Sequence, residues 1–135
     1  MAHWLIKSEP TVYSFADLQR DGSTIWDGVR NNQAALYLKA MKVGDEALFY
    51  HSQKDLAVVG IARVSQEAFL DPSDPAGRFV AVKVEPVKPL KTPVTLAAMK
   101  ANPDLAGMVM FRQFRLSVTP VNEAEWKVIL GMAGA

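Results

Sequence analysis

The sequence has 135 residues, of which 50% are hydrophobic and 21% are charged, a size and composition typical of one globular domain. It contains no cysteine, which excludes disulfides and thiolate chemistry, and no apolar run approaches the roughly 18 residues that a membrane span needs. The formal net charge of +1 disfavours a protein that neutralises many phosphates along a duplex. We expect a single domain over residues 1–135, without a secretory signal, in the cytoplasm or, in a eukaryote, the nucleus.

The first part of the chain predicts two strands and two helices. In chain order these are a strand over residues 3–7, a helix over 15–20, a helix over 31–41 and a strand over 46–51. Ser14 and Asp17 stand at the spacing of a capping box at the start of the first helix. The second helix is supported by Ala34, Leu38 and Met41, which fall on one helical face.

The remainder predicts further strands separated by turns and short helices. In chain order we expect a strand over residues 56–69, a loop over 71–77, a strand over 79–87, helices over 95–100 and 103–107, a strand over 115–118 and a last helix. Gly60 interrupts the first of these strands. Asn122 and Glu125 predict a second capping box, at the start of the last helix. Four to six strands with short helices between them predict an α+β fold built on a mixed β-barrel.

The nine residues from Trp26 to Ala34 are the most informative segment for function. They combine an aromatic ring, a carboxylate, a glycine, a guanidinium and three side-chain amides on a predicted loop and first helical turn. The ring offers stacking, and the polar groups can read donors and acceptors on a ligand. Taken singly, Trp26 could be a core residue, Asp27 a turn residue and Asn31 a helix cap. Together they favour a pocket for a flat polar ring such as a nucleobase.

Polar residues also follow two of the predicted strands, in Lys7–Glu9 and around His51. An ordinary ion pair explains Glu9 equally simply, and a lone histidine between aromatic residues, such as His51, is more often structural than a base. Cations gather at residues 83–100 and 112–115, which a solvated surface of mixed charge explains. The sequence has two histidines and no metal-ligand grouping, glycine-rich phosphate loop or nucleophile motif, so we expect no metal and no cofactor.

Five motifs that occur in order carry a resemblance to a known family. They are Trp4-Leu5-Ile6-Lys7-Ser8-Glu9-Pro10, the segment Trp26 to Ala34, Met41-Lys42-Val43-Gly44-Asp45, Phe49-Tyr50-His51-Ser52 and Arg115-Leu116-Ser117-Val118-Thr119-Pro120-Val121. From about Trp4 to Trp126 the chain closely resembles the EVE domain, a member of the PUA-like superfamily that is similar to the YTH domain. The resemblance implies a PUA-like mixed β-pseudobarrel of about five to six strands flanked by short helices.

The resemblance also implies a pocket for a single modified base, with Trp26 as a stacking wall. Its rim and floor would come from Lys7, Ser8, Glu9, Asp27, Val29, Arg30, Asn31, Tyr50, His51 and Ser52. Many members of the family have a longer segment that ends in Pro-Arg-Trp, at the point where this chain has Gly77-Arg78-Phe79. Either Phe79 takes the place of a second aromatic wall, or the pocket is more open on that side.

We therefore expect a non-catalytic reader of a modified nucleobase, either a modified cytosine or a methylated base, in DNA or RNA. The base would be flipped from its strand or single-stranded, since near-neutral charge favours local recognition. We expect no membrane partner. One alternative is an enzyme acting on a nucleotide-like small molecule, with Asp27, Glu9 or His51 as acid-base groups. A protein-interaction module is another.

Overall fold

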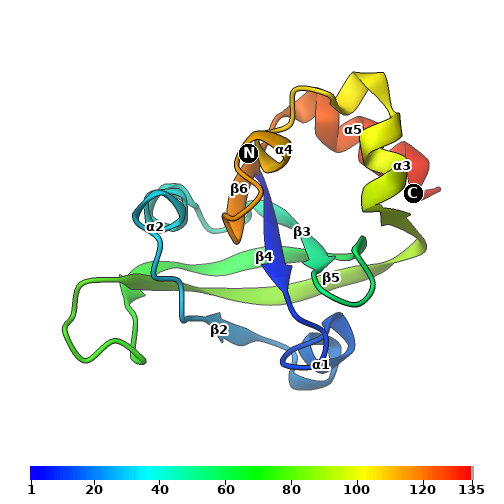
Figure 1. Ribbon diagram of the computed structural model, residues 1–135. Helices are drawn as coiled ribbons and strands as arrows, with labels where there is room; N and C mark the ends of the chain where they lie inside the picture. Colours follow the sequence, from blue (N-terminus) through cyan, green and yellow to red (C-terminus); the bar gives the residue numbers. More distant parts are fainter. Residues whose placement is uncertain (135) are drawn as a thin grey trace.

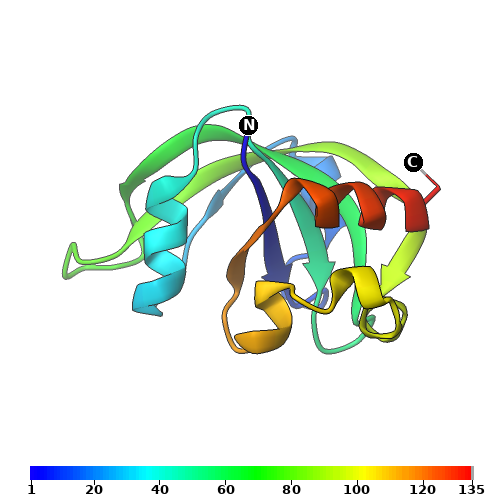
Figure 2. The same ribbon diagram turned by 90° about the horizontal axis from the view of Figure 1, so that it is seen from above.

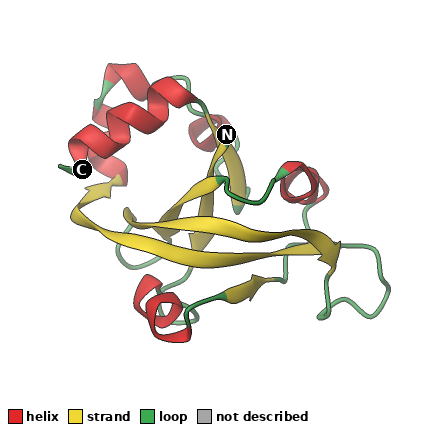
Figure 3. Cartoon of the chain, turned by 180° about the vertical axis from the view of Figure 1, so that it is seen from behind, coloured by secondary structure: helices red, strands yellow, loops and turns green. Residues whose placement is uncertain are grey.

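The structure, a computed structural model, describes residues 1–134, and these form one mixed sheet with helices on both of its sides (Figures 1 and 3). The strands are β1 (His3–Ser8), β2 (Thr24–Trp26), β3 (Glu46–His51), β4 (Ala57–Leu70), β5 (Val80–Thr95) and β6 (Val118–Val121). Their order across the sheet is β2-β5-β4-β3-β1-β6. Only β1 and β3 run parallel, and the other neighbours are antiparallel. The α+β mixed sheet expected from the sequence is confirmed.

Short helices occupy the connections between the strands. They are α1 (Phe15–Asp21), α2 (Asn32–Ala40), α3 (Leu96–Ala101), the 3-10 helix η1 (Pro103–Leu105), α4 (Val109–Arg112) and α5 (Glu123–Met132). Both predicted capping boxes are present, at Ser14 for α1 and at Asn122 for α5. Figures 1 and 3 show α1 and β2 on one side of the long β4–β5 ribbon, with α2 and α3–α5 on the other. Seen from above, α2 and α5 flank the strands between them (Figure 2).

The sheet buries both of its faces, because neighbouring residues along the central strands enter different hydrophobic clusters. Trp4 and Ile6 of β1 join Phe49 in a first cluster with α1, α2 and Trp26. Leu5 joins Tyr50 in a second cluster, which α3–α5 cover. Successive side chains of a strand point to opposite faces, so both clusters follow from this alternation. Because β1 and β3 are packed on both faces, the residues at the ends of these strands are held in fixed positions.

The parallel register of β1 and β3 brings the two polar strand ends together. Lys7 stands beside Tyr50 and Ser8 beside His51. Beyond the ladder, Ser52 N donates to Ser8 O at 2.9 Å. On the opposite edge of β1, Lys7 N donates to Ser117 O at 2.9 Å. The end of β1 is therefore fixed by backbone hydrogen bonds on both sides.

Trp26 lies in a strand that the sequence pattern does not predict. We expected Trp26 in a loop, but β2 pairs antiparallel with β5 and places Trp26 opposite Val82. Three residues are too few to show the alternation by which a strand is recognised. The helix in this region begins after its N-cap, Asn31, close to the predicted start.

Two other strands differ from the prediction because both contain proline. β5 continues to Thr95, where we expected an end at Val87, and β6 covers Val118–Val121, where we expected 115–118. Proline removes a ladder donor, so it resembles a strand end in the sequence. β6 tolerates Pro120 because it is an edge strand, and β5 shifts register repeatedly against β4. The four-residue helix α4 was also not predicted.

No helix within residues 1–134 is long and apolar enough to cross a membrane.

Candidate functional site

A cavity of about 530 Å³ opens where β1 and β2 end. Six of the residues expected at the site line it: Lys7, Ser8, Glu9, Trp26, Asp27 and Val29. Val12, Tyr13, Thr24, Ile25, Gly28 and Ser117 complete the wall. We call this space the first cavity. Its volume falls within the roughly 300–1,000 Å³ that is common for small-molecule sites.

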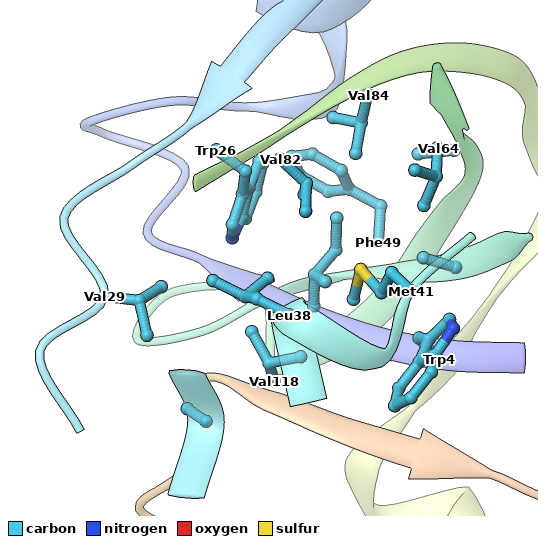
Figure 4. Close-up of a cluster of buried hydrophobic side chains, with 14 of the residues drawn as sticks. Trp4, Trp26, Val29, Leu38, Met41, Phe49, Val64, Val82, Val84 and Val118 are labelled. Carbon is cyan, nitrogen blue, oxygen red and sulfur yellow. The ribbon is translucent and has the colours of Figure 1, made fainter. Parts of the chain in front are cut away.

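Trp26 belongs to both the hydrophobic core and the cavity wall. The residue is only 8% exposed, and its ring meets the ring of Phe49 edge to face, with centroids 5.5 Å apart. Figure 4 shows it at the margin of the cluster, beside Val82. Its indole N–H donates no hydrogen bond within residues 1–134, whereas the indole of Trp4 donates to Asp45 at 3.1 Å. Trp26 therefore gives the cavity wall a ring that packing holds still, and its N–H has no partner within residues 1–134.

Two carboxylates stand at the cavity, on Glu9 and Asp27. Both residues are exposed, and neither forms an ion pair with another described residue. The backbone carbonyl of Glu9 accepts hydrogen bonds from Val12 N at 2.9 Å and from Tyr13 N at 2.8 Å, which fixes the turn after β1. Ser8 Oγ donates to Tyr13 O at 2.5 Å. The turn is held by its own groups, and the two carboxylates stay free to accept hydrogen bonds from a ligand.

Asp71 fastens the loop that follows Trp26 to the tip of the β4–β5 hairpin. Its side chain is fully buried, and one oxygen accepts from Gly28 N at 2.9 Å and Arg30 Nη1 at 3.0 Å. The other oxygen accepts from the backbone and the hydroxyl of Ser73, both at 2.7 Å. Burial alone would raise the pKa of Asp71, but these hydrogen bonds hold it at about 2, below the usual 3.8. Gly28 has φ of 80°, which a glycine adopts without strain.

His51 is engaged in structure at both ring nitrogens. Nε2 lies 3.0 Å from Phe15 N and accepts its hydrogen, so Nδ1 carries the ring proton and donates to Asp55 Oδ2 at 2.7 Å. The residue is buried and lines neither cavity. His51 therefore ties the end of β3 to the start of α1, in the structural role that the sequence left open.

A second cavity, of about 490 Å³, adjoins the first and shares Lys7, Glu9 and Ser117 with it. Two more of the expected residues, Tyr50 and Ser52, line this space. Gln53, Leu56, Phe114 and Arg115 form the rest of its wall. The residues predicted for one pocket are thus divided between two adjoining spaces.

Lys7 lies between the two cavities and contacts Phe114. Its ammonium lies 4.0 Å from the centroid of the Phe114 ring and donates to Phe114 O at 2.5 Å. Burial lowers the pKa of Lys7 to about 8, from its usual 10.5, because a desolvated ammonium is disfavoured. At neutral pH the amine is therefore still mainly charged.

Besides His51, three other expected residues line neither cavity. Asn31 caps α2 through a 3.0 Å hydrogen bond from Ala34 N and lines a third hollow with Arg112 and Phe114. Arg30 pairs with Asp71 and lies 5.4 Å from the centroid of the Phe79 ring. Phe79 also meets the Arg78 guanidinium, 5.2 Å away. The structure places Phe79 on the hairpin tip among arginines, so within residues 1–134 it supplies no second wall to the first cavity.

Sequence reasoning missed Tyr13, Asp71 and Phe114. Tyr13 comes soon after the end of the first predicted strand. That position next to Lys7–Glu9 could have indicated that it lines the same pocket. Asp71 lies 43 residues from its partner Gly28, in a loop rich in proline and aspartate, where a turn role is the ordinary explanation. Phe114 stands between two arginines, but nothing in the local pattern indicates that it is exposed.

Comparison with known proteins identifies the family. Residues 2–132 match the family model described as EVE domain. The chain is 33% identical over 165 residues to human thymocyte nuclear protein 1, an alignment that covers 97% of this chain and 73% of that protein. An NMR structure of a protein from Rhodopseudomonas palustris is 48% identical, with a TM-score of 0.94 and coverage of 99% of this chain and 94% of the other.

Two further solved structures were determined with nucleic acid. Human THYN1 protein in complex with 5-methylcytosine containing DNA is 32% identical, with a TM-score of 0.92 and coverage of 100% and 99% of the two chains. A Zygosaccharomyces rouxii YTH domain, in complex with N6-methyladenosine RNA, shares the fold at a TM-score of 0.61 and 15% identity, over 99% of this chain and 85% of that one. The ordered motifs, the mixed sheet and the matches along nearly the whole length agree. This chain belongs to the EVE domain family.

Proposed function

We propose that this protein is a non-catalytic reader of a modified nucleobase, which it binds in the first cavity. The observation that supports the proposal is the cavity itself. The packed ring of Trp26 lines it together with the carboxylates of Glu9 and Asp27, which are unpaired within residues 1–134. Stacking on an aromatic side chain is worth roughly 1–3 kcal/mol per base. The base would lie on Trp26, with its polar edge toward the end of β1 and its remaining surface against Val12, Ile25 and Val29.

A modified cytosine suits this combination of groups. Cytosine presents an exocyclic amino group, and Asp or Glu side chains accept its hydrogen bonds. Asp27 and Glu9 are the available acceptors, while the apolar wall would take a 5-methyl group. Burying a methyl group contributes about 0.8 kcal/mol, so selectivity also needs a shape that penalises the wrong base. The human relative, solved with 5-methylcytosine DNA, makes this the first base to test.

The arrangement of the acid-base groups favours binding over catalysis. Catalysis by Asp27, Glu9 or His51 would need a carboxylate that faces the imidazole across a cavity. Glu9 and Asp27 are exposed, and His51 is buried with both nitrogens engaged. The partner would be a DNA or RNA nucleotide, flipped or single-stranded, because flipping costs least there. The cytoplasm or the nucleus stays our prediction for the compartment.

Paired tryptophan variants test the proposal. Trp26→Phe keeps a ring but removes the larger stacking face and the free N–H, so we expect at least a fivefold weaker affinity for a short single strand that contains 5-methylcytosine. Trp126→Phe is the matched control, since Trp126 is equally buried but lies in the second cluster. It should keep the wild-type affinity. Calorimetric titration gives the affinities, and thermal melts show that both variants fold.

Two results would contradict the proposal. One is equal affinity of the wild-type protein for methylated and unmethylated strands of the same sequence, repeated across a panel of other modified bases. The other is a Trp26→Phe variant that binds as tightly as the Trp126→Phe control.

A further inference from the structure

The second cavity continues the first along the end of β1. The two spaces share Lys7, Glu9 and Ser117. Beyond the second cavity, Phe114 and Arg115 also line the third hollow. A chain bound with one unit in the first cavity therefore has two adjoining hollows beside it, across the residues that they share. The proposed function uses only the first of these three spaces.

Phe114 lines the second cavity and the third hollow, and its aromatic ring is held in place by Lys7. The residue is 45% exposed, which is a large apolar surface to leave in water. The Lys7 ammonium lies over the ring and is hydrogen bonded to the carbonyl of the same residue. Holding an aromatic ring in place while leaving nearly half of the residue exposed suits a stacking platform.

The charges around Phe114 favour an anionic partner. Arg115 lines the second cavity, Arg112 lines the third hollow, and Lys100 approaches the Phe114 ring to 5.7 Å. Within residues 1–134 none of these three cations forms an ion pair. The carboxylate of Glu9 lies at the junction with the first cavity, so a phosphate would be drawn toward the side of the arginines.

A residue in the wall of the second cavity carries a buried hydroxyl without a partner in the described part of the chain. The hydroxyl of Tyr50 is buried and makes no hydrogen bond, although Tyr50 lines the second cavity. Buried hydroxyls without a partner are uncommon in folded proteins.

We propose that the second cavity binds the nucleotide adjacent to the recognised base in the same strand, with the neighbouring base stacked on Phe114. Arg115 then meets the phosphate of that nucleotide. This inference rests on the proposed function, because the first base sets the position of the strand. It predicts that the protein is selective for one base but contacts at least two nucleotides.

Phe114→Ala tests the inference, with Leu36→Ala as the matched control. Leu36 is also an exposed apolar residue, but it lies on α2 and lines none of the three spaces. The ligands are 5-methyl-dCMP and a trinucleotide with 5-methylcytosine at its centre. We expect the wild-type protein to bind the trinucleotide at least fivefold more tightly than the mononucleotide. Phe114→Ala should lose most of that gain and keep its affinity for the mononucleotide, while Leu36→Ala matches the wild type.

A fluorescent neighbour identifies the contact directly. Two trinucleotides carry 2-aminopurine on one or the other side of 5-methylcytosine, and stacking quenches its emission. The emission of one of the two trinucleotides should be quenched when it binds the wild type or the Leu36→Ala variant. The emission of the same trinucleotide should not be quenched by the Phe114→Ala variant. A trinucleotide that gains nothing over the mononucleotide, or a gain that survives in Phe114→Ala, overturns the inference and leaves the proposed function intact. If neither ligand binds the wild type, both fail.

Discussion

Individual residues at this site belong both to the packed structure and to the walls of the cavities. Trp26 closes the first hydrophobic cluster against Phe49 and also forms a wall of the first cavity. Lys7 ends β1 and also fixes the ring of Phe114. A side chain that the core holds still binds a ligand with little loss of conformational entropy. The rigid sheet is thus the reason that a few residues suffice for a pocket.

Asp71→Asn should release the loop that carries Asp27 and Gly28. Asparagine has one acceptor oxygen and adds an N–H donor that faces the donors of Gly28, Arg30 and Ser73. We expect a loss of about 1–3 kcal/mol in the free energy of unfolding and a weaker affinity for the modified base. Asp74→Asn is the control, because within residues 1–134 the Asp74 side chain accepts only from the backbone N–H groups of Ala76, Arg78 and Phe79, inside the hairpin loop.

The same variant has a predicted pH dependence. The pKa of Asp71 is about 2 in the folded protein and near 3.8 unfolded, so its stabilising effect is complete above about pH 4 and is lost as the pH falls toward 2. Urea unfolding should therefore show the largest difference between wild type and Asp71→Asn at neutral pH, shrinking below pH 4. A difference that stays constant down to pH 2.5 would show that the charge of Asp71 is not the cause.

The chemistry of single residues was more predictable than their long-range partners. The aromatic, carboxylate and polar types at Trp26, Asp27 and Lys7–Glu9 indicate a binding site from the sequence alone. The hydrogen bond from Gly28 to Asp71 spans 43 residues and depends on where the hairpin tip folds, which no local pattern specifies. The two nitrogens of His51 were open to either role until their partners Phe15 and Asp55 were located.

Among the secondary-structure elements, α1 depends on a close approach to β4 at Gly60. A Cβ atom added at Gly60 would lie 2.5 Å from two ring atoms of Phe15, which anchors α1 in the first cluster. No side chain fits there unless the ring moves. The glycine that interrupts the predicted strand is thus the surface on which α1 packs.

Gly60→Ala should shift α1 and destabilise the protein by about 1–3 kcal/mol, the usual cost of overpacking a core. Chemical denaturation measures the loss. In a Phe15→Leu background the smaller side chain leaves room, so the same substitution should cost less. An equal penalty in both backgrounds would mean that the contact with Phe15 is not responsible.

Elements with strong local signals were predictable, and those defined by their neighbours were not. The two capping boxes and the apolar stripes located α1, α2 and α5. β2 is recognisable only by its pairing with β5, and β6 by its pairing with β1 despite Pro120. Short edge strands depend on the rest of the sheet, so a local pattern does not reveal them.

The whole molecule combines a sheet that is buried on both faces with three adjoining hollows at its surface. Because β1 and β3 are buried on both sides, their ends form a stable floor where the first and second cavities meet. The net charge of +1 leaves no broad positive field, and the unpaired cations around Phe114 are local. This distribution favours recognition of a short segment over tracking along a duplex.

The most direct test of the central claim follows the indole N–H resonances of the three tryptophans during titration with 5-methyl-dCMP. Trp4 donates to Asp45 and Trp126 lies in the second cluster, so within residues 1–134 only Trp26 of the three tryptophans lines the first cavity with an unpaired indole N–H. We predict that the Trp26 resonance alone shifts and saturates, and that unmethylated dCMP needs a higher concentration for the same shift. An unchanged Trp26 resonance at saturating ligand, or equal shifts of all three, would contradict binding at this site.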